Sequence, residues 1–350
     1  MTMRPIGDGK PCFITFEAGP THDGLEIAKQ LATLAAEAGA DAIKFQIIDA
    51  DRLVADRAQM FTYDVLTDRK TGEAKTVSEP LYEILKRRML TVAEWRDLKQ
   101  HCDSLSLAFF GTVTFDDELE LIAALKCDTV KIASADVNHF PFLRKAARTG
   151  MNVQIDTGNS TIGEVEAAVD LLSAEGSGGV IVHHCPPGYP AVPSAVNLRV
   201  IPTLKRLFGV PIAYSDHSPG WDMMVAAVAL GANVIEKTIT FDRTTRSPEH
   251  LFSLEPEDAK QFVKSIRTVE EALGGTRRVM TAEERKRRNA VRRSTYLAED
   301  AAAGMPVADL KVDFRRPGWG MGPDEFERMS GAKLRRACAK GHMLSHADLE

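Results

Sequence analysis

The sequence predicts an α/β protein in which a (β/α)8 TIM barrel is followed by a small C-terminal β-rich domain. Three observations predict this fold. Short apolar, β-rich runs alternate with helical patterns from residue 11 to about 275, which is typical of βα units and a parallel sheet. Eight such runs occur, which is the number of strands in a barrel. A doubly wound open sheet usually opens with a glycine-rich phosphate turn, and this chain has none.

The candidate strands share one form, a short apolar run that leads directly into polar or ionisable residues. They are residues 12–16, 41–45, 107–112, 128–132, 152–156, 179–183, 210–214 and 233–236. Amphipathic helices are expected between them. Apolar residues recur at helical spacing in 24–38, which Gly39 ends, and the same spacing is found in 161–174 and 256–273.

Two segments depart from this alternation. Residues 49–80 form a polar insertion with scattered aromatic side chains, and we expect either a cover over the substrate or a surface excursion. Residues 276–293 are strongly charged, which favours a solvated helix or linker over a nucleic-acid site. We therefore predict a barrel domain over residues 1–275, a charged linker over 276–293 and a second domain over 294–350. The second domain is small enough that we expect it to pack on a barrel.

The composition is that of a globular protein of 350 residues, with 44% hydrophobic and 27% charged residues. A net charge of −5 gives no general reason to expect a nucleic-acid partner. No stretch approaches the roughly 20 apolar residues of a membrane span, and the N-terminus lacks a long apolar signal region. The five cysteines are scattered without CxxC spacing, as expected for reduced thiols of a cytoplasmic protein.

Ionisable residues at the strand ends are the candidate active-site groups, because the loops after the strands of a barrel form its active site. Lys44 and Lys131 follow apolar strands, where burying an unpaired ammonium group is costly. Either lysine alone could pair with a neighbouring acid. Two lysines that converge from different strands, beside the hydroxyls of Ser134, Thr157 and Ser215, favour a site for a phosphate plus a carboxylate.

His217 is a candidate metal ligand, since a neutral imidazole suits divalent transition metals. A single histidine is more often a structural hydrogen-bonding residue, but Asp216 and Glu236 offer oxygen ligands within plausible reach. Glu17 follows the first strand and has three open roles. It could bind sugar hydroxyls, polarise a water molecule, or cap the helix that starts at Gly24.

Many motifs, in one order along nearly the whole chain, resemble the sialic acid (N-acetylneuraminate) synthase family, of the spore coat polysaccharide biosynthesis type. These motifs are Glu17-Ala-Gly-Pro-Thr-His22-Asp-Gly24, Gly39-Ala-Asp-Ala-Ile-Lys44-Phe-Gln46, Lys131-Ile-Ala-Ser134, Asp156-Thr157-Gly158, Ser215-Asp216-His217 and Glu236-Lys237. Residues from 294 onward resemble the small antifreeze-like (SAF) domain, with Arg316-Pro317-Gly318 as its landmark.

The resemblance implies an N-acylneuraminate-type synthase. Members of this family condense phosphoenolpyruvate with the aldehyde form of an N-acylhexosamine, which gives a nine-carbon 3-deoxy-ulosonic acid and phosphate for surface polysaccharide or glycan biosynthesis. The resemblance also implies one divalent metal ion, Mn2+ or Mg2+, that polarises the aldehyde oxygen. It further implies a domain-swapped homodimer in which the SAF domain reaches the sugar in the barrel of the partner subunit.

The strand-end residues and the resemblance together predict roles for individual residues. The predicted residues are, for catalysis, Glu17, Lys44, Lys131 and Asp216; for substrate binding, Ser134, Asp156, Thr157, Tyr189, Ser215, Glu249 and Arg316; and for the metal ion, His217 and Glu236. In this assignment the lysines and serines hold phosphoenolpyruvate, whereas Glu17, Tyr189 and Arg316 contact the sugar.

Four positions depart from the family pattern. Thr238 stands where a second metal-binding histidine is usual, and a threonine hydroxyl is a poor neutral ligand, so we expect one weakened metal site. Asp156 replaces a serine that usually contacts phosphoenolpyruvate, and it could either ligate the metal ion or repel an anionic substrate. Two anions ~4 Å apart repel by roughly 4 kcal/mol at an effective dielectric constant of about 20, which is enough to change ligand choice. Pro187 replaces a polar phosphate contact, and Glu249 replaces an aspartate.

Two other functions stay open. One is a divergent enzyme of the same fold that uses another aldose or another enolate donor, and the other is a catalytically silent binding protein. An enzyme is favoured, because a scaffold has no physical need to keep the following residues together: Glu17, Lys44, Lys131, Ser134, His217 and Arg316.

Overall fold

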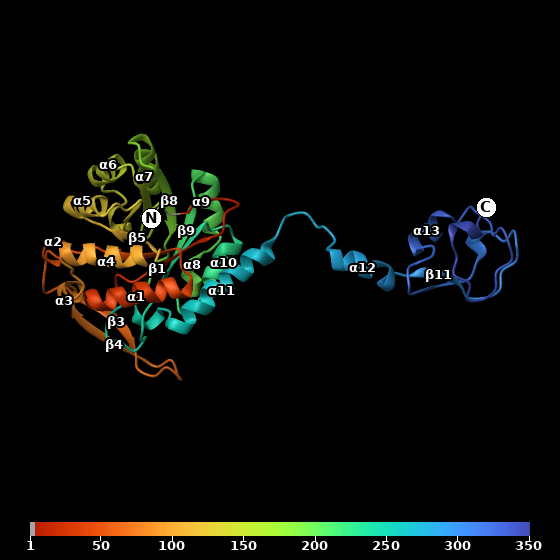
Figure 1. The fold of residues 1–350 in the computed structure, drawn as a ribbon, viewed down its shortest axis with the longest axis horizontal. Coiled ribbons are helices and arrows are strands. Elements are labelled where there is room, and N and C mark those ends of the chain that lie inside the picture. The colour runs from red at the N-terminus through yellow and green to blue at the C-terminus, as the bar shows by residue number, and fades with distance from the viewer. Residues whose placement is uncertain (1–3) are drawn as a thin grey trace. The chain divides into compact units, whose positions relative to one another are not determined.

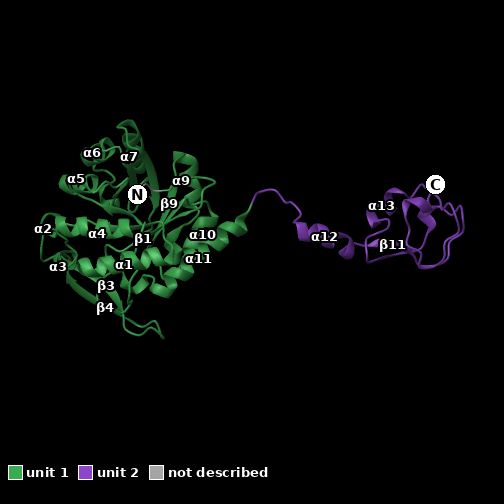
Figure 2. Cartoon of the chain, viewed as in Figure 1, with its two compact units in different colours: residues 1–274 green, residues 275–350 purple. Residues whose placement is uncertain are grey.

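The structure is a computed structural model that describes residues 4–350. The chain divides into two compact units between Gly274 and Gly275 (Figure 2). The first unit holds the barrel, and the second holds both the charged segment 276–293 and the residues that follow it. No helix within the described residues is long and apolar enough to cross a membrane.

The first unit contains a closed barrel of eight parallel strands, which confirms the predicted fold class. Every predicted strand is present, with bounds that shift by no more than two residues. The barrel strands are β1 (Phe13–Glu17), β2 (Ala42–Gln46), β5 (Ala108–Thr112), β6 (Thr129–Ile132), β7 (Asn152–Asp156), β8 (Gly179–His184), β9 (Ile212–Asp216) and β10 (Val234–Thr238). Each pairs with the next barrel strand along the chain, and β1 pairs with β10 to close the ring.

Helices cover the outside of the barrel (Figure 1). The longer ones are α1 (Leu25–Ala38), α4 (Val92–Ser104), α5 (Asp116–Ala124), α6 (Phe140–Arg148), α7 (Ile162–Ala174), α9 (Val200–Phe208), α10 (Asp222–Ala229) and α11 (Pro256–Leu273). Capping residues fix where they begin, as Thr91 and Glu94 do in a reciprocal capping box at α4. α1 ends where Gly39 takes a left-handed φ of 87°, a conformation that favours glycine.

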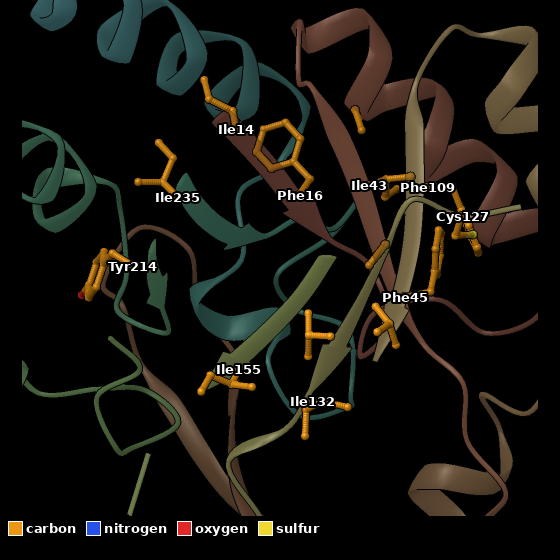
Figure 3. Packing of buried hydrophobic residues seen from close by; sticks show 14 of the residues in the cluster. Ile14, Phe16, Ile43, Phe45, Phe109, Cys127, Ile132, Ile155, Tyr214 and Ile235 are labelled. Carbon is orange, nitrogen blue, oxygen red and sulfur yellow. The ribbon is translucent and has the colours of Figure 1, made fainter. Parts of the chain in front are cut away.

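Alternate residues of each strand face opposite sides of the barrel wall. Outward-facing side chains such as Ile14, Phe16 and Phe45 belong to the main hydrophobic core under the helices (Figure 3). Phe13 and Phe110, which face the other way, belong to a separate buried cluster inside the barrel near the strand starts. Polar and charged side chains occupy the interior positions further along the strands, so the fold concentrates them at the C-terminal end of the barrel.

Residues 49–80, predicted only as a polar insertion, contain a β-hairpin. The segment and its continuation hold α2 (Ala50–Leu53), the antiparallel strands β3 (Met60–Leu66) and β4 (Ala74–Pro80), and α3 (Leu81–Lys86). Arg69, in the turn between the two strands, forms ion pairs with Asp242 at 2.6 Å and with Glu255 at 2.9 Å. The hairpin is thereby tied to the segment between β10 and α11, which also carries Glu249.

The second unit begins with helix α12 (Ala282–Val291), which lies in the charged segment. The rest is built from short elements. These are β11 (Ser294–Leu297), η3 (Val307–Asp309), β12 (Val312–Arg315), α13 (Pro323–Arg328) and η4 (His346–Asp348), with β11 and β12 paired antiparallel. Leu297, Val307 and Leu344 lie at the centre of a small core that is separate from the barrel core.

Candidate active site

A cavity of about 390 Å³ opens at the C-terminal ends of the barrel strands. This is the end at which barrel enzymes carry their active sites. Of the residues predicted from the sequence, the cavity is lined by Glu17, Lys44, Ser134, Asp156, Tyr189, Ser215, His217, Glu236 and Glu249. Lys131, Thr157 and Asp216 do not line it, and Arg316 belongs to the second unit.

Lys44 and Lys131 converge on one carboxylate beside the cavity. Both lysines are buried, and both ammonium groups reach Oε1 of Glu236, Lys44 at 2.8 Å and Lys131 at 2.6 Å. Lys44 also pairs with Glu17, and Lys131 pairs with Asp156 at 3.0 Å. The sequence left two possibilities open for these lysines, which were pairing with acids and convergence on one site. The structure shows both at once.

The charges in this cluster shift one another's pKa values. Although burial acts in the opposite direction, the charges of Lys131 and Lys44 hold the pKa of Glu236 well below its ordinary value. Burial alone would lower the pKa of Lys44, but the charges of Glu17 and Glu236 raise it well above its ordinary value. Burial raises the pKa of Glu17 and of Asp156. With three carboxyl groups around two ammonium groups, the cluster is therefore able to take up either a proton or a further cation.

The three hydroxyl residues predicted to lie beside the two lysines differ in their partners. Ser215 Oγ donates at 2.7 Å to the same carboxylate oxygen that receives both lysines. Ser134 Oγ accepts from the N–H of Gly158 at 3.0 Å, and a Cβ at Gly158 would lie only 2.7 Å from it, so the close approach requires glycine. Thr157 Oγ1 donates to the carbonyl oxygen of His183 at 2.8 Å. Ser134 and Ser215 are therefore the candidate anion contacts, whereas Thr157 joins β7 to β8.

Asp216 was predicted to be catalytic. In the structure its carboxylate belongs to a buried network of hydrogen bonds and one ion pair. Its carboxylate pairs with Lys237 at 2.7 Å and accepts from the hydroxyls of Tyr214 at 2.9 Å and Ser218 at 2.7 Å. Lys237 also donates to the carbonyl oxygen of Ser218. The network fixes the backbone on both sides of His217, so Asp216 acts on that imidazole by positioning it.

The donor atoms around His217 fit a divalent metal ion. Nδ1 of His217 and Oε2 of Glu236 are buried and make no hydrogen bond, and both residues line the cavity. Burial lowers the pKa of His217 to about 4, which keeps the imidazole neutral and able to donate a lone pair. Buried polar atoms without partners are costly, so a ligand that engages both atoms is favoured.

Thr238 adds no ligand to this pair. Its hydroxyl donates to Glu249 Oε2 at 3.4 Å, and Thr238 is not on the cavity lining. Among residues 4–350, three His, Cys, Asp or Glu donor atoms lie within 4.8 Å of one another only in the second unit. An ion held by His217 and Glu236 would therefore take its remaining ligands from water or substrate.

Glu249 and Arg88 form a second charged region beside the cavity. Burial, together with the charge of Glu17, raises the pKa of Glu249 to about 7. Arg88 is buried, donates to the hydroxyl of Ser247, and acts against this rise through its positive charge. Arg88 was not predicted, because in the sequence it belongs to the basic run 86–88, which is typical of an exposed helix end.

Three further lining residues, Gln46, Asp136 and Asn159, were not predicted either. Each lies at or shortly after the end of a barrel strand. Gln46 closes one of the family motifs, but that motif implied no role for it, and Asp136 and Asn159 stand in none of the quoted motifs. The sequence therefore identifies the charged centre of the cavity better than its polar rim.

The chain is similar to known proteins along nearly its whole length. A family model, that of the NeuB family, matches residues 31–278. The N,N'-diacetyllegionaminic acid synthase of Legionella pneumophila is 33% identical over 353 residues, which cover 99% of this chain and 97% of that protein. The N-acetylneuraminate-9-phosphate synthase of Homo sapiens is 30% identical over 338 residues, which cover 95% of this chain and 90% of that protein.

A solved structure shows the same similarity. The crystal structure of the N-acetylneuraminic acid (sialic acid) synthetase from Leptospira borgpetersenii, in complex with citrate, matches with a TM-score of 0.70 and 30% sequence identity. The match covers 82% of this chain and 94% of that chain. Together with the family match over most of the barrel, these similarities confirm the resemblance found in the sequence motifs. The chain belongs to the NeuB family of synthases.

Proposed function

We propose that this chain condenses phosphoenolpyruvate with the aldehyde form of an N-acylhexosamine. The products are a nine-carbon 3-deoxy-ulosonic acid and inorganic phosphate, for surface polysaccharide or glycan biosynthesis. The observation that carries this proposal is that two buried lysines, Lys44 from β2 and Lys131 from β6, converge on Glu236 at a cavity whose lining includes Lys44 and the hydroxyl residues Ser134 and Ser215. Fixed cations and hydroxyl donors of this kind suit a substrate with a phosphate and a carboxylate. The relatives, which include synthases of legionaminic and sialic acids, support the same reaction class.

The residues of the cavity can perform this reaction in a defined order. Lys44 and Lys131 bind phosphoenolpyruvate as cations, and the raised pKa of Lys44 makes it a fixed charge instead of a base. The enol carbon then forms the new C–C bond with the aldehyde carbon. Water adds to the resulting oxocarbenium-like carbon, and Glu17 moves one proton of that water to the former aldehyde oxygen. The C–O bond to the phosphate then breaks, and the remaining hydroxyl proton leaves with the phosphate as the ketone of the product forms.

His217 and Glu236 would hold the metal ion, Mn2+ or Mg2+. When bound, the ion supplies Lewis-acid polarisation of the aldehyde oxygen. Tyr189 packs against His217 with ring centroids 4.4 Å apart, and it lines the cavity together with Glu249. These two side chains are our candidates for the contacts to the sugar, since a phenol and a carboxylate both hydrogen-bond to sugar hydroxyls.

Phosphate release tests the proposed reaction directly. Phosphoenolpyruvate would be offered with a panel of N-acylhexosamines, free and 6-phosphorylated, with and without Mn2+. We expect phosphate only when both substrates are present, and the preferred sugar will show the highest kcat/KM. Release with a different aldose would correct the substrate but retain the chemistry. A folded chain that neither releases phosphate with any sugar nor binds phosphoenolpyruvate would instead support a silent binding protein.

We also propose that the active form is a homodimer in which the second unit completes the barrel site of the partner. The support is the landmark Arg316, which stands on a loop with Pro317 and Gly318 in a unit with a small core of its own. Residues 274–281, between α11 and α12, connect this unit to its own barrel, and in our proposal they let it reach a neighbouring subunit. We place the reaction in the cytoplasm, because all five cysteines are free thiols, as in a reducing compartment.

Thr238→His should tighten the binding of Mn2+ by about tenfold or more, which is ~1.4 kcal/mol. The physical reason is that an imidazole replaces a hydroxyl that makes no contact with the cavity. Isothermal titration of the protein with Mn2+ alone measures the Kd. Thr238→Val, which removes the hydroxyl without adding a ligand, is the matched control and should leave the Kd unchanged. An unchanged Kd in folded Thr238→His would show that position 238 does not face the metal site.

Arg88→Met should raise KM for the sugar by about tenfold while KM for phosphoenolpyruvate stays nearly constant. Arg88 anchors Ser247, two residues before Glu249, and its charge favours the ionised form of that carboxyl group. Loss of this charge moves the Glu249 pKa further above 7, so more of the group is protonated at neutral pH and fewer hydroxyl hydrogen bonds can be accepted. The increase in KM should therefore be greatest at or below pH 7 and diminish as the pH rises.

Two variants separate this effect from general damage. Arg88→Lys keeps the charge and should restore part of the sugar affinity, whereas Arg87→Met, at the neighbouring arginine, should change neither KM. A purely structural role for Arg88 would alter both KM values together and would leave the shape of the pH profile unchanged. That result would remove Arg88 from the sugar site.

A further inference from the structure

A second group of metal-ligating side chains lies in the second unit, on residues that the synthase reaction does not use. The Sγ of Cys338, a ring nitrogen of His342 and a carboxylate oxygen of Asp348 all lie within 4.8 Å of one another. Cys338 and Asp348 are buried. Thiolate, imidazole and carboxylate are the ligands that zinc prefers in proteins. His342 Nε2 is 3.1 Å from Asp348 Oδ2, close to the ~3.3 Å between two ligands of a tetrahedral zinc ion with bonds of about 2.0 Å.

The nitrogen of His342 that faces this group has no hydrogen bond. Nε2 is shielded from solvent, although 31% of the side chain is exposed. It lies 3.1 Å from Asp348 Oδ2, a distance at which a nitrogen lone pair and a carboxylate oxygen repel each other unless a proton or a metal ion lies between them. The same pair of atoms can therefore hold a proton in the metal-free unit and a metal ion in its place.

Oδ1 of Asp348 keeps one acceptor position free for such a cation. An ionised carboxylate has about two lone-pair sites on each oxygen. Oδ1 accepts only from the guanidinium of Arg336 at 2.9 Å, whereas Oδ2 accepts from the N–H of Ser345 at 3.0 Å and from its hydroxyl at 2.8 Å. Outer contacts of this kind orient a carboxylate that ligates a metal.

Backbone hydrogen bonds hold Cys338 and His342 in fixed positions. Cys338 and Ala301 exchange two hydrogen bonds of 2.9 Å, and the carbonyl oxygen of His342 accepts from Leu297 N at 3.0 Å. The turn between the two residues is closed by His342 N donating to Ala339 O at 3.0 Å. Three residues separate the cysteine and the histidine, a spacing that also occurs between zinc ligands. The ligands are therefore preorganised on a rigid frame.

We propose that Cys338, His342 and Asp348 bind a zinc ion that stabilises the second unit. The Cys338 thiol transfers its proton to solvent when the sulfur–zinc bond forms, and water fills the fourth coordination position. The unit has a physical need for such an ion. Its core is small, and small domains usually depend on a disulfide, a metal ion or an assembly for stability. Cys338 is the single cysteine of this unit and is a free thiol, so a disulfide within the unit cannot supply the stability.

Zinc titration of the full chain tests this site. His217→Ala serves as the background, because it disables the barrel site. In that background we expect one equivalent of Zn2+ by calorimetry and by elemental analysis. Cys338→Ser and His342→Ala should each weaken binding by at least about 100-fold, since even outer-shell partners of metal sites contribute ten- to a hundredfold. His346→Ala removes an exposed histidine of the same unit and should leave the Kd unchanged.

Cobalt gives an independent readout of the ligand set. Co2+ bound to the His217→Ala chain should show thiolate-to-metal charge-transfer absorption, and Cys338→Ser should abolish it. The proposal is overturned if the His217→Ala chain takes up no zinc, or if it takes up zinc equally well after Cys338→Ser and His342→Ala. The first of these outcomes involves no substitution in the second unit, so a folding defect there cannot obscure it.

Discussion

Lys131→Ala should lower kcat/KM for phosphoenolpyruvate by about 1000-fold, or ~4 kcal/mol of transition-state stabilisation. Lys131 is a buried cation that pairs with both Glu236 and Asp156. Its removal deletes the contact that we propose to the anionic substrate, and it also leaves two buried carboxyl groups with one fewer cation to offset them. Steady-state kinetics and a phosphoenolpyruvate binding isotherm measure the loss.

The control must separate lost chemistry from lost folding. Removing one partner of a buried ion pair typically costs about 3–5 kcal/mol of stability, so thermal unfolding should accompany the kinetics. Lys131→Met, which retains most of the volume, is the second variant, and Lys145→Ala, at an exposed lysine paired with Asp116, is the matched control. A folded Lys131→Met chain with normal phosphoenolpyruvate affinity and turnover would remove Lys131 from the site.

Mixing an inactive Arg316→Ala chain with an inactive Lys131→Ala chain should restore activity. In a two-fold dimer completed in trans, one of the two sites of each mixed dimer combines an intact Lys131 with an intact Arg316. Random exchange makes half of the dimers mixed, so about a quarter of the sites, and about a quarter of the normal rate, should return. Tagged chains, purified through both tags after dissociation and re-association, allow the rate of the mixed dimer to be measured.

The matched mixture pairs Lys131→Ala with Lys44→Ala. Both changes lie in the barrel, so no site of the mixed dimer regains both lysines, and this mixture should stay inactive. If purified mixed dimers of the Arg316 and Lys131 variants were as inactive as either parent, completion of the site by the partner would be wrong. Arg316 would then act within its own subunit or have no role in the reaction.

The barrel and the charged centre of its cavity could be predicted because both follow from short stretches of sequence, namely apolar runs that contain or lead into charged residues. A buried strand of a parallel barrel is a short apolar run, and its last residues must meet the active site. Lys44, Lys131, Glu17 and Glu236 could be recognised because each stands in such a run, where a charge has no structural use. The ion-pair and hydrogen-bond partners of each residue could not be predicted from such short stretches.

Features that depend on long-range packing were missed. The hairpin of β3 and β4 lies in an insertion whose polar composition does not distinguish a strand from a loop. Asp216 stands at the end of a strand, as a catalytic acid would, but its carboxylate forms an ion pair with Lys237 on the neighbouring strand. Arg88 is distant in sequence from every motif and reaches the site only because the segment around Ser247 folds over it. Register and loop closure decide all three cases, and neither can be read from a single chain segment.

In the site that we propose, the shared oxygen of Glu236 would couple the binding of the two ligands thermodynamically. Oε1 accepts from Lys44, Lys131 and Ser215 at once, so an anion that engages both lysines would leave this buried carboxylate with an uncompensated charge. A divalent cation on Glu236 would remove that penalty. Anion and cation would then promote each other's binding, by the same factor in both directions. On this proposal a metal site that is weak in the free enzyme becomes stronger once phosphoenolpyruvate is bound, and the absence of a second histidine at Thr238 costs least during turnover.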